Sequence, residues 1–247
     1  MKILPKKLRQ YFKNSLGIQF LLDQNEQLVR RVAMLESQLY ESRDDLEQDA
    51  RHRWEISNPD VHLTWGEEIS GDAFIAQAMS YDLFGKDRNV LEIGPGYGRL
   101  LTSMLKQEVA YASYLGVDIS ASQVRHLTDA FANEKTIFVQ GNAETFNTDN
   151  TFDVLISSLT LKHIFPSFEK AIRNVSRFMK PGAMTFIDFI EGDSRKFEDD
   201  GQTYVRHYTR EELTGIMALA GFEIVDFDIV NHTDEHSRLV VIARKTA

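Results

Sequence analysis

The chain has 247 residues, of which 43% are hydrophobic and 26% are charged, and it contains no cysteine. A chain of this composition can bury a sizeable core. The lack of cysteine excludes a disulfide framework, a thiolate nucleophile and a metal site with cysteine ligands. No apolar run reaches the roughly 18 residues that span a bilayer, and the first residues lack a signal-peptide pattern. We therefore expect a cytoplasmic protein.

The net charge of −9 is unevenly distributed. Residues 1–16 carry five basic side chains and no acidic one, which leaves a charge of −14 for the rest of the chain. That acidic remainder argues against nucleic acid as a partner. The basic residues alternate with apolar ones, as in amphipathic segments that bind an anionic membrane surface. We expect either peripheral contact with the inner face of a membrane or a solvated extension of the helix that follows.

Residues 18–46 show a heptad pattern that predicts a coiled-coil helix over residues 17–56. The a positions are Ile18, Asn25, Val32, Leu39 and Leu46, and the d positions are Leu21, Leu28, Leu35 and Ser42. Asparagine at an a position favours a parallel dimer, whereas leucine at the last two a positions leaves a trimer open. The alternative is a single amphipathic helix that packs on its own domain.

Residues 57–87 form a connecting and cap segment between this arm and the rest of the chain. It opens with the turn sequence Asn58-Pro59-Asp60 and contains a predicted helix over Ser70–Phe84. Trp65 is a candidate for substrate binding, because the face of an aromatic ring suits the apolar side of a sugar. Ordinary core packing is the alternative for this side chain.

Residues 88–247 alternate strand-like and helix-like stretches. Strands are predicted at 89–93, 114–117, 136–139, 152–157, 184–189, 222–230 and 238–243, and helices at 98–107, 120–132, 168–179 and 210–220. This alternation predicts an α/β fold, a doubly wound and mostly parallel sheet covered on both faces. Such sheets bind ligands at the carboxyl ends of their strands.

Chemical motifs follow the first strands at regular intervals. A strand that ends in Glu92-Ile93 leads into glycines 94, 96 and 98, and the second strand ends in Asp118. Gln140-Gly141-Asn142 follows the third strand, and a turn at Lys180-Pro181-Gly182 precedes the fifth. Together these segments resemble the class I S-adenosylmethionine-dependent methyltransferases. The resemblance implies a Rossmann-like sheet of seven strands with an antiparallel last strand.

The resemblance also implies S-adenosyl-L-methionine as the cofactor and a set of residues that bind it. Asp118 would hold the ribose hydroxyls, and the glycine loop would lie under the methionine part. The full set is Glu92, Gly94, Gly96, Gly98, Asp118, Ile119, Asn142, Ala143, Glu144, Ser158 and Leu159. No metal is predicted, because the acids around the fifth strand are more typical of a solvated loop.

Candidate catalytic residues come from two later segments. His163 follows the fourth strand, in the region that leads toward the acceptor in this family, and histidine is well suited to remove a proton near neutral pH. His207 and Tyr208 are further candidates, with Arg206 as a substrate-binding residue. The alternative for each is capping or packing. Thr209 and Glu212 form a predicted capping box.

The sequence therefore predicts a self-associating methyltransferase with an N-terminal coiled coil. The expected acceptor is an oxygen atom of a sugar or surface glycan. The methyl group would be transferred in line to this oxygen, and a general base would remove its proton. A natural product or quinone-type acceptor is the first alternative. The second is a scaffold that binds the cofactor without catalysis.

Overall fold

The structure, a computed structural model, describes residues 44–57, 69–198, 202–233 and 237–247, together with positions 21, 24 and 28. The chain divides into two compact units, Met1–Asp44 and Asp45–Ala247. The basic tip, most of the heptad segment and Trp65 lie outside the described residues. Predictions for them are not tested by the fold.

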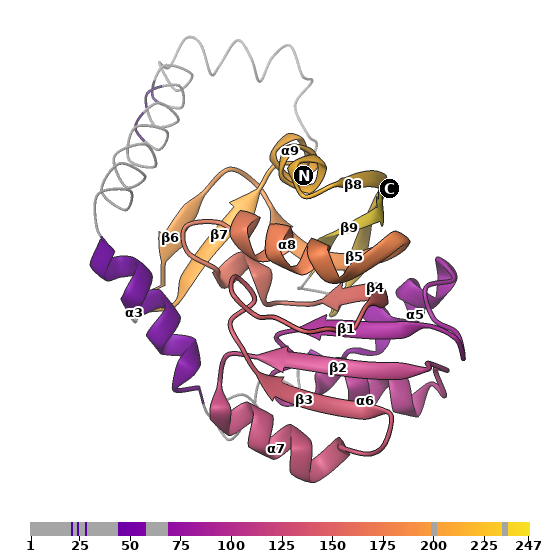
Figure 1. Ribbon diagram of the computed structural model, residues 1–247. Coiled ribbons are helices and arrows are strands. Elements are labelled where there is room, and N and C mark those ends of the chain that lie inside the picture. Colours follow the sequence, from indigo (N-terminus) through magenta and orange to yellow (C-terminus); the bar gives the residue numbers. More distant parts are fainter. Residues whose placement is uncertain are drawn as a thin grey trace, which may run out of the picture. The chain divides into compact units, whose positions relative to one another are not determined.

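In its described residues, the second unit is built on one sheet of nine strands. The strands are β1 (Asn89–Ile93), β2 (Ser113–Asp118), β3 (Thr136–Gln140), β4 (Phe152–Ser157), β5 (Met179–Glu191), β6 (Arg195–Phe197), β7 (Tyr204–Tyr208), β8 (Phe222–Asn231) and β9 (Ser237–Lys245). The helices are α3 (Asp44–Glu55), α5 (Asp72–Ser80), α6 (Arg99–Lys106), α7 (Ala121–Phe131), α8 (Glu169–Val175) and α9 (Arg210–Leu219), with short 3₁₀ turns η1 (Leu161–His163) and η2 (Ser176–Phe178). Figure 1 shows β3, β2, β1 and β4 side by side in the sheet.

The predicted fold class is confirmed, and the number of strands is corrected from seven to nine. Strands β1 to β5 pair in parallel, while β9 runs antiparallel to both β5 and β8. The additional strands are β6 and β7, an antiparallel pair that continues the sheet from the end of β5. No strand is predicted for this segment, because its sequence is rich in polar residues and has no run of apolar ones.

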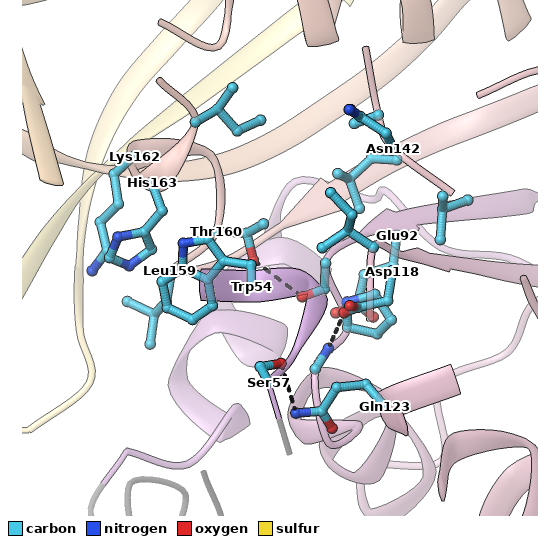
Figure 2. A pocket seen from close by; sticks show the side chains of 18 of the residues that line it. Trp54, Ser57, Glu92, Asp118, Gln123, Asn142, Leu159, Thr160, Lys162 and His163 are labelled. Carbon is cyan, nitrogen blue, oxygen red and sulfur yellow. Dashed lines mark hydrogen bonds between the residues drawn. The ribbon is translucent and has the colours of Figure 1, made fainter. Parts of the chain in front are cut away.

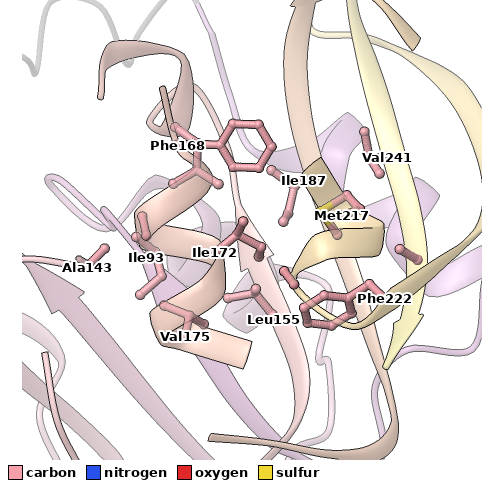
Figure 3. Packing of buried hydrophobic residues seen from close by; sticks show 14 of the residues in the cluster. Ile93, Ala143, Leu155, Phe168, Ile172, Val175, Ile187, Met217, Phe222 and Val241 are labelled. Carbon is pink, nitrogen blue, oxygen red and sulfur yellow. The ribbon is translucent and has the colours of Figure 1, made fainter. Parts of the chain in front are cut away.

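Helices cover both faces of the sheet, as the continuous apolar strands require. Adjacent residues of a strand point to opposite faces, so Leu91 joins one core cluster and Val90 the other. The first cluster contains side chains from α8 and α9, among them Ile172, Val175 and Met217, packed against Ile187 and Val241 (Figure 3). The second contains side chains from α5 and α6. The sheet is thereby fixed in position, and its carboxyl edge is left for a site.

Two local predictions concern the ends of elements. The capping box at the start of α9 is confirmed: the Thr209 side chain accepts from the Glu212 N–H, and the Glu212 side chain accepts from the Thr209 N–H. The turn predicted before the fifth strand is wrong, because β5 already begins at Met179 and runs through Lys180-Pro181-Gly182. The register between β4 and β5 shifts at this point, which lets the strand accommodate proline and a glycine with φ of +80°.

Candidate functional site

The carboxyl ends of β1, β2 and β4 border a pocket of about 230 Å³ within the second unit. All the predicted cofactor residues except Gly98 line it: Glu92, Gly94, Gly96, Asp118, Ile119, Asn142, Ala143, Glu144, Ser158 and Leu159. Figure 2 shows Asp118, Glu92 and Asn142 on one side of this pocket, and His163 and Lys162 on the other. The pocket therefore has two chemically different ends.

The glycine loop between β1 and α6 uses its three glycines in different ways. All three have positive φ, which L side chains rarely adopt. A Cβ on Gly94 would collide with the Thr160 side chain, and a Cβ on Gly98 would collide with the Phe131 ring and a Leu127 methyl group. Gly96 has open space in that direction. Gly94 and Gly98 therefore allow close packing, whereas Gly96 presents its backbone to the pocket.

Asp118 ends β2 with a carboxylate that is only 8% exposed. One oxygen accepts the N–H of Gly96 at 3.0 Å and the other accepts the N–H of Ser120 at 2.9 Å. Burial raises the pKa of this carboxyl, and the backbone N–H groups partly offset the rise. A carboxylate has about four acceptor positions, so each oxygen still has a lone pair for a ligand.

Glu92, on β1, is the more deeply buried of the two carboxyls. It is 1% exposed, lines the pocket and accepts a hydrogen bond from the Tyr114 hydroxyl. Burial raises the pKa of Glu92 to about 7, against the lowering effect of that hydrogen bond. An incoming cation would favour the ionised form of both carboxyls. This end of the pocket is therefore suited to a positively charged ligand.

Helix α3 closes one side of the pocket through Arg51 and Trp54. Arg51 lies 3.6 Å from the Glu144 carboxylate, and the Ser120 hydroxyl donates to the carbonyl oxygen of Ser57, just past the helix, at 2.8 Å. Arg51 and Trp54 belong to the predicted coiled-coil helix over residues 17–56, but from Asp45 onward the chain is part of the second unit. Trp54 was missed because it lies beyond the last heptad position, Leu46, and belongs to no motif.

His163 lies on η1, immediately after β4, and lines the pocket opposite the acidic end. Its Nδ1 is 2.7 Å from the carbonyl oxygen of Tyr204, and its ring centroid is 4.7 Å from that of Trp54. Burial, with the neighbouring Lys162 charge, lowers the pKa of His163 to about 3. The ring is therefore neutral at physiological pH. Since a carbonyl only accepts, Nδ1 carries the proton and Nε2 is the basic nitrogen.

The other predicted reaction residues do not line this pocket. Tyr208 is fully buried between Phe168 and Phe189, and its hydroxyl accepts the Phe168 N–H at 3.3 Å. Arg206 binds the Pro166 carbonyl and the Glu212 carboxylate and lies over the Tyr208 ring. His207 Nδ1 lies 3.1 Å from the Ser194 hydroxyl. We do not place these three in the reaction.

A buried acid and base support the pocket from behind. The Asp188 carboxylate accepts from the Ser158 hydroxyl, from the Leu159 N–H at 2.7 Å and from His232 Nε2 at 3.1 Å. Both the Asp188 and the His232 side chains are completely buried. Burial acts to raise the pKa of Asp188, but the hydrogen bond and charge of His232 outweigh it and the pKa is lowered. The network holds Leu159 at its positive φ of 60°.

The described part of the chain has no group of three or more metal-ligating side chains. None of its helices is long and apolar enough to cross a membrane.

Residues 91–187 match a family described as a methyltransferase domain. A polyketide synthase–nonribosomal peptide synthetase of Aspergillus clavatus is 28% identical over 176 residues, 62% of this chain and 4% of that protein. A ubiquinone/menaquinone biosynthesis C-methyltransferase of Klebsiella pneumoniae is 27% identical over 174 residues, 58% of this chain and 69% of that protein. The chain thus spans a small part of the first relative and about two thirds of the second.

The fold is also similar to solved methyltransferase structures. The 1,6-didemethyltoxoflavin-N1-methyltransferase of Burkholderia thailandensis, solved with S-adenosylhomocysteine, superposes with a TM-score of 0.62 at 22% identity. The match covers 76% of this chain and 83% of that one. The fold of the chain therefore agrees with the methyltransferase domain that residues 91–187 match.

Proposed function

We propose that this chain, an S-adenosylmethionine-dependent methyltransferase, methylates a hydroxyl oxygen on a small ring-shaped acceptor, for which a sugar is the expected class. The observation that supports the proposal most is the state of His163. Its ring lines the pocket as a neutral imidazole, with Nδ1 committed to the Tyr204 carbonyl and Nε2 left to accept a proton.

The residues at the acidic end of the pocket fit the cofactor. Asp118 has a free lone pair on each oxygen for the two ribose hydroxyls, and Gly96 leaves open space beside it. Glu92 and Asp118 supply negative charge where the cofactor brings a positive one. When bound, the cofactor supplies a methyl group activated by a sulfonium.

In this proposal His163 acts on the acceptor and not on the cofactor. A hydroxyl hydrogen-bonded to Nε2 is oriented with a lone pair directed away from the imidazole, which is the alignment that an in-line displacement needs. The hydroxyl proton becomes strongly acidic as the oxygen gains the methyl group, so even an imidazole with a low pKa can take that proton. The same low pKa keeps the histidine unprotonated, and thus ready to accept, across the physiological range.

The aromatic side of the pocket supports a ring-shaped acceptor. Trp54 and Phe165 line the pocket near His163, and a flat aromatic surface can stack on the apolar face of a pyranose. Trp54 thereby takes the part that the sequence analysis gave to Trp65. A surface-glycan acceptor also accords with the predicted membrane contact of residues 1–16, because such glycans are assembled at membranes.

A quinone or other natural product is the second candidate acceptor. It is supported by the names of the relatives, a quinone C-methyltransferase and a polyketide–peptide synthase. An aromatic ring would also stack on Trp54. Carbon or ring-nitrogen methylation would place less demand on the basic nitrogen of His163, so the two candidates differ in their dependence on that residue.

The test is methyl transfer from labelled cofactor to a panel of sugar, phenol and quinone acceptors, with the wild type and His163→Gln. We expect transfer to a hydroxyl, and a loss of about 100-fold or more in kcat in the variant, the usual contribution of a general base. The affinity for S-adenosylhomocysteine, measured by calorimetry, should be retained, because His163 lies at the opposite end of the pocket from Asp118.

The matched control is His126→Gln, on α7 and outside the pocket lining. It should leave both kcat and cofactor affinity unchanged. An unchanged kcat in His163→Gln would remove the histidine from the reaction and favour the carbon or nitrogen alternative.

A further inference from the structure

Lys162 is a buried cation that the proposed reaction does not use. Its side chain is 6% exposed and lines the pocket beside His163 (Figure 2). Among the described residues, its ammonium has no hydrogen-bond acceptor and no carboxylate at ion-pair distance. Burying a charge without a partner is costly, and buried charges in proteins are normally paired.

The nearest acids are already engaged. Asp188 accepts from Ser158, Leu159 and His232, and Glu198 pairs with Lys196 at 3.4 Å. Both attract Lys162 only at longer range. The missing partner of the ammonium is therefore not one of these two carboxylates.

Other cations strengthen the positive potential at this end of the pocket. Burial, together with the charges of Arg238 and Arg99, lowers the pKa of Lys162 to about 8. Burial lowers the pKa of His207, and the charges of Lys196, Lys162 and Arg238 add to the lowering. Lys162 is still mostly protonated at neutral pH, so this end is positive although the whole chain carries −9.

The two ends of the pocket are thus opposite in charge. Glu92 and Asp118 lie on one side in Figure 2, and Lys162 lies on the other, beyond Trp54. The acidic end suits the cationic cofactor. We propose that Lys162 binds a carboxylate or phosphate group of the acceptor, so that the substrate class is a hydroxyl compound with an anionic substituent. This inference rests on the proposed function, because it places the acceptor at the His163 end.

The test uses the protein saturated with S-adenosylhomocysteine and three probes of similar shape: benzoate, phenyl phosphate and the neutral benzamide. Calorimetric titration should show at least one of the two anions binding about tenfold or more tightly than the amide, as expected for a charge-assisted hydrogen bond. Comparison of benzoate with phenyl phosphate distinguishes a carboxylate from a phosphate as the preferred group.

Lys162→Met should abolish the preference for the anion, and Lys162→Arg should retain it. Methionine is close in volume and removes a buried charge, so the variant is expected to fold; Lys162→Gln provides a second neutral variant, and thermal unfolding checks all three. Lys135→Met is the matched control, because Lys135 is exposed at the start of β3, away from the pocket. It should keep the preference.

Equal affinities for the anions and the amide, or no binding of any of the three probes, would overturn the inference. A preference for the anions that survives in Lys162→Met would also overturn it. Cofactor binding separates this failure from that of the proposed function. A protein that binds S-adenosylhomocysteine but shows no anion preference refutes only the role of Lys162. A protein that does not bind S-adenosylhomocysteine refutes the proposed function itself.

Discussion

Glu92 and Asp118 show how one kind of residue serves the site in two ways. Both are buried carboxyls at the carboxyl ends of neighbouring strands, and burial raises the pKa of each. Asp118 is held by two backbone N–H groups, which fix its orientation toward the pocket. Glu92 is held by the Tyr114 hydroxyl instead, and its pKa is raised to about 7.

The stability of the protein without cofactor should reflect Glu92. Its pKa is higher in the folded protein than the ordinary 4.5, so the folded state binds the proton more tightly. This contribution to the free energy of unfolding is present at low pH and is lost as pH rises from about 4.5 through about 7. Urea unfolding at pH 5 and pH 8 should show a smaller loss over this range in Glu92→Gln than in the wild type.

Glu134→Gln, an exposed position, is the control for that comparison and should follow the wild type. A Glu92→Gln protein with the same pH dependence as the wild type would mean that the Glu92 carboxyl does not titrate in this range.

At the scale of elements, α3 is the structure's main addition to the site. It is placed by Ser57, which binds α7 through Ser120 and Gln123, and by the ion pair from Arg51 to Glu144. Because Arg51 is 38% exposed, that pair contributes little to stability. The indole of Trp54 packs against His163, and this contact bears on the acceptor that we propose.

Fluorescence can follow α3 directly, because the chain has two tryptophans. In Trp65→Phe the emission comes from Trp54 alone. We expect it to change saturably with S-adenosylhomocysteine, with a midpoint equal to the calorimetric Kd, since Trp54 lines the pocket. A second variant in which both Trp54 and Trp65 are replaced by phenylalanine shows how much of the signal change comes from the ligand itself. Emission that is insensitive to the ligand would contradict the position of α3.

At the scale of the whole molecule, the second unit contains the site and the first holds most of the heptad segment. Leu21 and Leu28, both at predicted d positions, are helical and 63% and 60% exposed. Leucines at d positions are buried when a coiled coil forms. The predicted self-association through residues 18–46 therefore stays a prediction that solution measurements can decide.

Leu28→Asp in the full chain should convert an oligomer to a monomer by light scattering, because a charge at a d position opposes burial of the heptad seam. Methyl transfer should continue, since the site lies in Asp45–Ala247. Deletion of residues 1–43 should have the same effect. An oligomer that persists in both variants would place the interface on the second unit.

The sequence by itself determined the parallel core of the sheet and most of the residues at the acidic end of the pocket. These features depend on local signals: short apolar strands, glycines that must take positive φ, and acids at strand ends. Predicted strands 89–93 and 152–157 coincide with β1 and β4 for the same reason. The β6–β7 pair escaped prediction because its strands depend on the edge of β5 rather than on their own apolar pattern.

Only the tertiary structure decided which of the candidate reaction residues line the pocket. His163, His207 and Tyr208 carry similar local signals, yet only His163 reaches the pocket, while Tyr208 fills the core and His207 binds Ser194. Trp54 also lines the pocket, although its helix α3 is far from His163 in the sequence. Lys162, the residue next to His163, lines the pocket as well. Side-chain direction and long-range packing set these positions, and neither follows from spacing along the chain.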